Sequence, residues 1–253
     1  MVANMGEKAP PGGRAQTRAR AVLRPLSLRL WRFTIEGLEN LPTEGPAIIC
    51  PNHVSFLDSA FTMIHVGRSI SFVGKAEYMD SWKTRRLFPM LGMIPIDRSG
   101  GSRSESALAA AEEVLARGEL FGIFPEGTRS RDGMLYKGHT GAARLALRTG
   151  APLIPVGIVG TREIQPPDTL MPKLRRPVTL RFGAPIDTSR HAMGGIDRLA
   201  LRTLTDELMF EIRELTGQEY RNVYATRRAE NLPTETGAIA TGQMDGPQEL
   251  FAP

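Results

Sequence analysis

Short apolar runs alternate with helix-like segments along most of this chain, and this alternation constrains the fold more than any other feature. Runs such as "AIIC" (residues 47–50) and "PLIPVGIV" (residues 152–159) have the length of buried strands. A strand that is apolar on both faces needs helices on both sides of its sheet. We therefore predict an α/β fold, a single domain with a mixed, mostly parallel sheet flanked by helices.

The same patterns place the individual elements. Strands are expected at residues 33–42, 46–50, 70–75, 93–97, 120–125, 151–160 and 177–183. Helices are expected from residue 59 and at residues 78–87, 102–117, 140–150 and 196–216, with Gly118 and Gly150 as stop signals. Ligand sites in such sheets lie at strand ends, so polar motifs at those points are the candidates for function.

Composition divides the chain into three parts. Its 253 residues, 41% of them hydrophobic, suffice for one core. Residues 1–32 are predicted to hold a flexible leader, up to about residue 17, and a short amphipathic segment from about Pro25. Residues 33–225 are predicted to form the domain, and residues 226–253 to be a disordered tail.

Basic charge is concentrated in the first of these parts. The net charge is +5, and residues 1–32 carry seven Lys and Arg against one Glu, a balance of +6, which leaves −1 for the rest. A basic arm can bind nucleic acid or an anionic membrane surface. The apolar Leu26, Leu28 and Trp31 among these cations favour the membrane surface and argue against nucleic acid. Alternatively, the same residues pack on the domain, because Pro25 limits the helix to about two or three turns.

The single cysteine and the hydropathy pattern indicate a compartment. Cys50 cannot form an internal disulfide, and its place in an apolar run predicts a buried thiol in a reducing, cytoplasmic environment. No apolar run approaches the roughly 18 residues needed to span a bilayer, and no signal-peptide core is found.

The stretch "NHVSFLD" (residues 52–58) follows one of the buried strands. The chain has four His, and His53 stands at this strand exit, five residues before Asp58. On an ideal helix two such side chains point about 140° apart, so they meet only if the chain turns between them. The carboxylate could then hold one imidazole nitrogen and leave the other as a general base for a hydroxyl. The alternative is a structural His bonded to a helix-capping Asp.

A second polar stretch, "FPEGTRS" (residues 124–130), follows another strand. Gly127 permits close backbone approach, and Arg129 offers a planar fork of donors to a phosphate or carboxylate. Arg98, in "IDRS" at a third strand end, can join the same anion site. Glu126 can fix one of these Arg side chains or accept a bond from a ligand hydroxyl. An ordinary turn with a surface ion pair is the alternative.

Other chemistries find no support in the sequence. Ser55 lies in the His–Asp loop without a nucleophile-elbow pattern. No second His or Cys stands at ligand spacing, so no metal is predicted, and no Walker A or Gly-rich dinucleotide loop indicates a cofactor. Direct attack by a bound hydroxyl is the simplest mechanism.

Four stretches taken in order, "NHVSFLD", "GMIPIDR", "FPEGTRS" and "APLIPVGI", resemble the sequence blocks of the glycerolipid acyltransferase family, whose bacterial type member is 1-acylglycerol-3-phosphate acyltransferase. The likeness extends more loosely over about residues 33–220. It implies the family's fold and transfer of an acyl group from acyl-CoA or acyl-carrier protein to lysophosphatidic acid. Glycerol 3-phosphate or another lysophospholipid as acceptor, and a non-catalytic lipid-binding protein, are the alternatives.

The resemblance also implies roles for individual residues. It makes His53 the base and Asp58 its orienting partner. The acceptor's phosphate would be bound by Arg98, Glu126, Gly127, Thr128 and Arg129, and the surroundings shaped by Asn52, Ser55, Pro125 and Pro155. Many relatives have N-terminal transmembrane helices, and none is found in this sequence. We therefore expect peripheral binding to the inner face of the cell membrane through the segment that carries Trp31.

Overall fold

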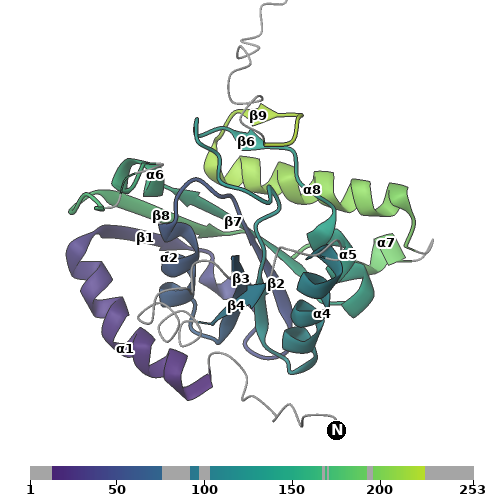
Figure 1. Cartoon of the computed structure of the whole chain (residues 1–253), viewed down its shortest axis with the longest axis horizontal. Helices are drawn as coiled ribbons and strands as arrows, with labels where there is room; N and C mark the ends of the chain where they lie inside the picture. Colours follow the sequence, from purple (N-terminus) through teal and green to yellow (C-terminus); the bar gives the residue numbers. More distant parts are fainter. Residues whose placement is uncertain are drawn as a thin grey trace, which may run out of the picture.

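A computed structural model describes residues 13–75, 92–96, 103–166, 169, 171–192 and 196–225 (Figure 1). The elements in chain order are α1 (Gly13–Leu30), β1 (Arg32–Glu36), η1 (Leu38–Asn40), β2 (Ala47–Pro51), α2 (Leu57–His65), β3 (Ile70–Lys75), β4 (Met93–Ile96), α4 (Arg103–Ala116), β5 (Leu120–Gly122), β6 (Leu135–Tyr136), α5 (Gly141–Thr149), β7 (Leu153–Val159), α6 (Thr161–Ile164), β8 (Pro177–Phe182), α7 (Ser189–Ala192), α8 (Arg198–Thr216) and β9 (Tyr220–Arg221).

A seven-stranded sheet with the order β1-β8-β7-β2-β5-β3-β4 forms the middle of the domain. Its neighbouring strands run parallel, and β7 with β8 is the antiparallel pair. The predicted α/β class and the mixed, mostly parallel sheet are therefore confirmed. The order brings β7, β2 and β5 side by side, so their carboxyl ends open on one edge.

Helices cover both faces of the sheet, as the apolar strands require. Ile48 and Cys50 of β2 lie in a core with residues of α4, α5 and α8, whereas Ala47 and Ile49 lie in a second core with residues of α2. Side chains alternate between the two faces of a strand, and this places successive residues of β2 in different cores. Figure 1 shows α1 and α2 on one side and α4, α5 and α8 on the other.

Most elements lie where the patterns placed them. α5 ends at Thr149 and is capped by Gly150, whose φ of 70° is the left-handed conformation that favours glycine. β5 is shorter than expected, because a turn closed by the Gly127 N–H and the Phe124 carbonyl begins soon after it. The short parallel pair of β6 and β9 was not anticipated. The helix expected at residues 78–87, the tail 226–253 and the first part of the leader lie outside the described residues.

The N-terminal helix corrects one expectation. It starts at Gly13 and contains Pro25, so residues 13–17 are helical and not part of a flexible leader. The side chain of Gln16, 2% exposed, donates to the Ile70 carbonyl at 2.8 Å and accepts from the Ile70 N–H at 3.2 Å. These contacts with Ile70, the first residue of β3, stabilise the first turns of α1. Nothing in residues 1–32 alone predicts them.

Trp31 bears on a second expectation. It is buried, its Nε1 donates to the Lys173 carbonyl at 2.8 Å, and its ring meets that of Phe61 edge-on. The alternative, packing on the domain, therefore holds for Trp31 itself, and binding of its segment to a membrane surface stays a prediction. Within the described ranges, no helix combines the length and apolarity required to cross a bilayer.

Candidate active site

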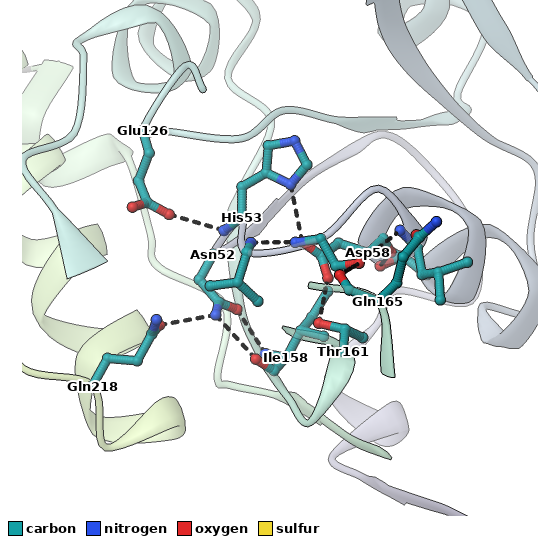
Figure 2. Close-up of polar contacts among 12 residues, drawn as sticks. Asn52, His53, Asp58, Glu126, Ile158, Thr161, Gln165 and Gln218 are labelled. Carbon is teal, nitrogen blue, oxygen red and sulfur yellow. Dashed lines mark hydrogen bonds and ion pairs between the residues drawn. The ribbon is translucent and has the colours of Figure 1, made fainter. Parts of the chain in front are cut away.

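Asn52 fixes the point where the chain leaves β2. Its buried amide donates to the Ile158 carbonyl at 3.0 Å and accepts from the Ile158 N–H at 2.7 Å, so it bridges to β7 as a backbone group would (Figure 2). The same Nδ2 donates to Oε1 of Gln218 at 2.8 Å. A side chain with this many fixed partners holds the residue that follows it, His53, in a defined position.

His53 and Asp58 form the contact that the sequence predicted. Nδ1 of His53 lies 2.9 Å from Oδ2 of Asp58, which stands in the first turn of α2 and is 0% exposed. The same oxygen accepts the N–H groups of Val54 and Ser55, both at 2.8 Å. Because Oδ2 acts as an acceptor, Nδ1 carries a proton, and in the neutral form of the ring Nε2 then has the free lone pair. Asp58 thus accepts backbone N–H groups of the turn before α2 and orients the imidazole, a geometry that a general-base pair requires.

The imidazole of His53 faces open space on its other side. Its ring stacks on Phe124, with centroids 3.8 Å apart and planes 14° apart, and its side chain is 17% exposed. Figure 2 shows the nitrogen remote from Asp58 pointing away from the hydrogen-bonded cluster. A neutral imidazole held in this way can take a proton from a hydroxyl that reaches Nε2.

Glu126 holds the backbone of His53 and does not face a ligand. Its Oε1 accepts the His53 N–H at 2.8 Å and its Oε2 accepts the Tyr136 N–H at 3.0 Å, while the Ser130 N–H donates to the His53 carbonyl at 2.7 Å. The side chain is 1% exposed, and burial raises the pKa of its carboxyl to about 8. The assignment of Glu126 to substrate binding is therefore corrected. Both of its carboxylate oxygens already accept backbone N–H groups, because the loop that carries Glu126 folds back over the end of β2.

The rest of the "FPEGTRS" loop lies beside the histidine. Gly127 has a φ of 73°, and a Cβ there would come within 3.0 Å of the His139 ring, so the close approach favours glycine. Gly127, Thr128 and Arg129 line the same cavity as His53. Within the described part of the chain, no acidic side chain pairs with Arg129. Arg98 lies outside the described residues.

A cavity of about 700 Å³ opens at His53. Apolar side chains of β3, β4, β5 and α4 form one part of its lining, including Phe72, Met93, Leu108, Ala111 and Phe121. The polar part comes from the loop after β5 and the start of α5, with Arg129, His139, Thr140 and Arg144. A space with one apolar wall and one cationic wall suits a ligand that has a hydrocarbon chain and an anionic group.

Of the remaining predicted residues, Pro125 lines the cavity, whereas Ser55 and Pro155 support the site without lining it. The hydroxyl of Ser55 is buried and donates to the Gln165 carbonyl at 3.2 Å. Pro155 lies opposite Cys50 in the pairing of β7 with β2, and burial raises the pKa of the Cys50 thiol far above its usual range. The carbonyl of Pro125 accepts the His139 N–H at 2.8 Å. None of these groups is placed as a nucleophile.

Two residues of the site were missed by the sequence reasoning. The Thr161 hydroxyl donates to Oδ1 of Asp58 at 2.6 Å. It follows a buried strand after Gly160 alone, and that strand-exit signal could have found it. Gln218, after α8, bonds Asn52 and the Gly133 carbonyl. No local pattern marks it, because its partners lie far away in the chain.

Comparison with known proteins gives concordant matches. The model of a family described as Acyltransferase matches residues 32–159. A chloroplast 1-acyl-sn-glycerol-3-phosphate acyltransferase of Arabidopsis thaliana is 36% identical over 137 residues, 54% of this chain and 38% of that protein. An uncharacterized protein of Mycobacterium tuberculosis is 28% identical, with 82% of this chain and 67% of that protein covered.

A solved structure agrees with these matches. The 1-acyl-sn-glycerophosphate acyltransferase of Thermotoga maritima is similar with a TM-score of 0.61 and 26% sequence identity, covering 80% of this chain and 83% of that one. The alignment with the Arabidopsis protein spans less than half of that relative's length. The matches confirm the resemblance that the four sequence blocks indicated: this chain belongs to the acyltransferase family.

Proposed function

We propose that this protein transfers a fatty acyl group from a thioester to the free hydroxyl of lysophosphatidic acid, with phosphatidic acid as product. The observation that carries the proposal is the His53–Asp58 pair, whose free Nε2 opens into the cavity that Arg129 also lines. The names of the relatives, 1-acyl-sn-glycerol-3-phosphate acyltransferases, support the same reaction.

In the proposed mechanism His53 acts as base and then as acid. Its Nε2 takes the proton of the acceptor hydroxyl while that oxygen bonds to the thioester carbonyl carbon. The carbon–sulfur bond then breaks, and the sulfur leaves with the proton that His53 returns. Asp58 keeps the imidazole in the required tautomer and stabilises its charged form between these steps. The donor is acyl-CoA or acyl-carrier protein, and the products are the ester and a free thiol.

Arg129 is proposed to bind the acceptor's phosphate. Arg129 lines the cavity beside Gly127 and Thr128, and the planar fork of donors of a guanidinium suits a phosphate. Arg129→Ala should raise the KM for lysophosphatidic acid at least about tenfold, because a charge-assisted hydrogen bond is lost. An unchanged KM would remove Arg129 from this role and favour an acceptor without a phosphate.

Thiol release tests the reaction itself. Purified protein, vesicles and either acyl-CoA or acyl-carrier protein are mixed with and without lysophosphatidic acid, and free thiol is followed over time. Release that requires the acceptor supports the proposal, and the preferred thioester identifies the donor. Vesicle binding without release from any donor would favour a lipid-binding protein. Thiol release with glycerol 3-phosphate but not with lysophosphatidic acid would identify glycerol 3-phosphate as the acceptor.

We also propose that an anionic membrane surface is the partner of α1 and residues 171–176. The two segments are joined, since the Arg175 N–H donates to the Leu30 carbonyl at 2.7 Å. Neither contains an acidic residue. Their exposed apolar residues are Val22, Leu26, Leu28, Met171 and Leu174, and their exposed cations include Arg24, Arg29, Lys173, Arg175 and Arg176. Apolar side chains among cations suit anionic headgroups over an acyl layer.

Vesicle pelleting tests this surface. Leu26→Glu with Leu174→Glu should weaken binding to phosphatidylglycerol vesicles at least about tenfold, since two apolar contacts become like-charged with the lipid. Leu199→Glu on α8 is the matched control, because Leu199 is 73% exposed and lies on a different element. The proposed membrane surface would be rejected if the Leu199→Glu control lost as much vesicle binding as the double variant. It would also be rejected if the original protein bound neutral phosphatidylcholine vesicles equally well.

A further inference from the structure

The second oxygen of Asp58 has a partner that the catalytic pair does not explain. Oδ1 accepts the hydroxyl of Thr161 at 2.6 Å, and both residues are 0% exposed. Thr161 is the first residue of α6, separated from β7 by Gly160 alone, and lies beyond the segment 32–159 that the family model matches. Figure 2 shows it on the side of Asp58 opposite to His53.

We propose that Thr161 is a positioning residue that sets the orientation of the Asp58 carboxylate and, through it, the imidazole of His53. Oδ2 accepts three donors, from His53, Val54 and Ser55, whereas Oδ1 has the Thr161 hydroxyl. Donors on both oxygens hold the plane of a carboxylate against rotation. Without the hydroxyl, Oδ1 would lose that bond at a site that water does not reach.

A second contact from the same short helix supports this role. The carbonyl of Gln165, the residue that follows α6, accepts the Ser55 hydroxyl at 3.2 Å. α6 is therefore bonded to the His53–Asp58 turn at two points, through Asp58 and through Ser55. Its Ile164 is 0% exposed, so the element that carries Thr161 is packed into the domain.

The hydroxyl also influences the charge that His53 experiences. A donor on Oδ1 withdraws negative charge from the carboxylate, so its removal leaves more charge on Oδ2 and favours the protonated imidazole. Among the described residues, the other ionisable groups near His53 are Glu126, bonded to its backbone, and Arg129, His139 and Arg144, which line the same cavity. A change at Thr161 alters none of these, so a shift in the titration of His53 reports the Asp58 contact.

Thr161→Val and Thr161→Ser form the test pair, because Val keeps the shape without the hydroxyl and Ser keeps the hydroxyl. Thr161→Val should lower kcat about 10- to 100-fold, the range for loss of a hydrogen bond to a charged group, with the acceptor KM unchanged. The acid limb of the kcat/KM profile should move to higher pH. Thr161→Ser should restore kcat to within about threefold of the original protein.

Thr205→Val is the matched control. Thr205 is also 0% exposed, and its hydroxyl donates to the Leu201 carbonyl of its own helix at 2.7 Å. This variant loses one buried hydroxyl bond as well, so it should be destabilised without a change in kcat or in the pH profile. If Thr161→Val behaves like Thr205→Val, or if Thr161→Ser is as impaired as Thr161→Val, the positioning role is refuted.

The kinetic readout rests on the proposed acyl transfer, so an NMR titration of the His53 imidazole provides a second one. The signal is assigned by its absence in His53→Ala. A shift to higher pH in Thr161→Val, absent in Thr161→Ser and Thr205→Val, supports the positioning role even if the protein transfers no acyl group. Identical titrations in all three variants would overturn it, whatever the activity.

Discussion

Residues 32–159 and residues 160–225 contribute to the candidate site in different ways. The first region, which the family model matches, supplies the His53–Asp58 pair and the loop with Arg129. The second supplies Thr161, which donates to Asp58, and Gln218, which accepts from Asn52. Neither residue lines the cavity. The described residues that line the cavity thus all belong to the first region, whereas the groups that hold them come from both, Asn52 and Glu126 from the first and Thr161 and Gln218 from the second. Variants of residues that line the cavity should therefore lose more activity than variants of the residues that hold them.

The largest effect is expected at His53. His53→Ala removes the proposed base, so kcat for acyl transfer should fall about 10²- to 10⁴-fold, while circular dichroism and the thermal midpoint stay close to those of the original protein. His191→Ala is the control, since His191 pairs with Glu207 on the far helices α7 and α8. Retained activity in His53→Ala would exclude the histidine from the mechanism. The distinction between residues that face the cavity and residues that hold them would then have no basis.

Glu126 belongs to the first region but holds the backbone of His53 and does not line the cavity. A variant at Glu126 therefore tests whether the loss of kcat depends on facing the cavity or on belonging to the first region. Glu126→Gln loses one of two acceptors and leaves the N–H of His53 or Tyr136 without its partner. We expect kcat to fall about 10- to 100-fold. Activity equal to that of the exposed-site control Glu39→Gln would show that the bonds from Glu126 to the His53 and Tyr136 N–H groups do not affect turnover.

The same variant has a predicted effect on stability against pH. The folded-state pKa of Glu126 is raised to about 8 by burial, so the folded protein favours the protonated acid. Its contribution is fully present below the unfolded-state pKa of about 4.5 and is lost as pH rises towards 8. Urea unfolding of the original protein should therefore lose a few kcal/mol over this range relative to Glu126→Gln. Parallel curves for the two proteins would contradict the buried, protonated carboxyl.

The smallest effect is expected in the second region, at Gln218. Gln218→Ala removes the bridge from the end of α8 to Asn52 and to the Gly133 carbonyl, whose bonds are 2.8 and 2.7 Å long. Loss of neutral hydrogen bonds of this kind should lower kcat up to about tenfold and stability by about 1–2 kcal/mol. Glu219→Ala, at the exposed neighbouring position, is the control. A loss as large as that of His53→Ala would break the distinction between the two regions.

The sequence predicted most of the elements and the contact between His53 and Asp58 because both rest on local signals. Apolar runs of strand length located β2, β3 and β7, and the strand exits located His53 and Arg129. The five-residue spacing of His53 and Asp58 needs only a turn into a helix, which α2 provides. Contacts between residues so near in the chain follow from the backbone path, so the pair could be predicted before the sheet order was known.

Only the tertiary structure decided which groups surround that pair. Glu126 was assigned to a ligand because nothing in its neighbourhood shows that the loop folds onto the His53 backbone. The start of α1 depends on Gln16 meeting Ile70, and Thr161 meets Asp58 because β7 lies beside β2 in the strand order. Such partners are separated by tens of residues, and their contacts arise from strand order and packing and not from any local pattern. The physical reason is that burial and hydrogen-bond partners are properties of the assembled sheet, whereas propensity and periodicity are properties of the chain.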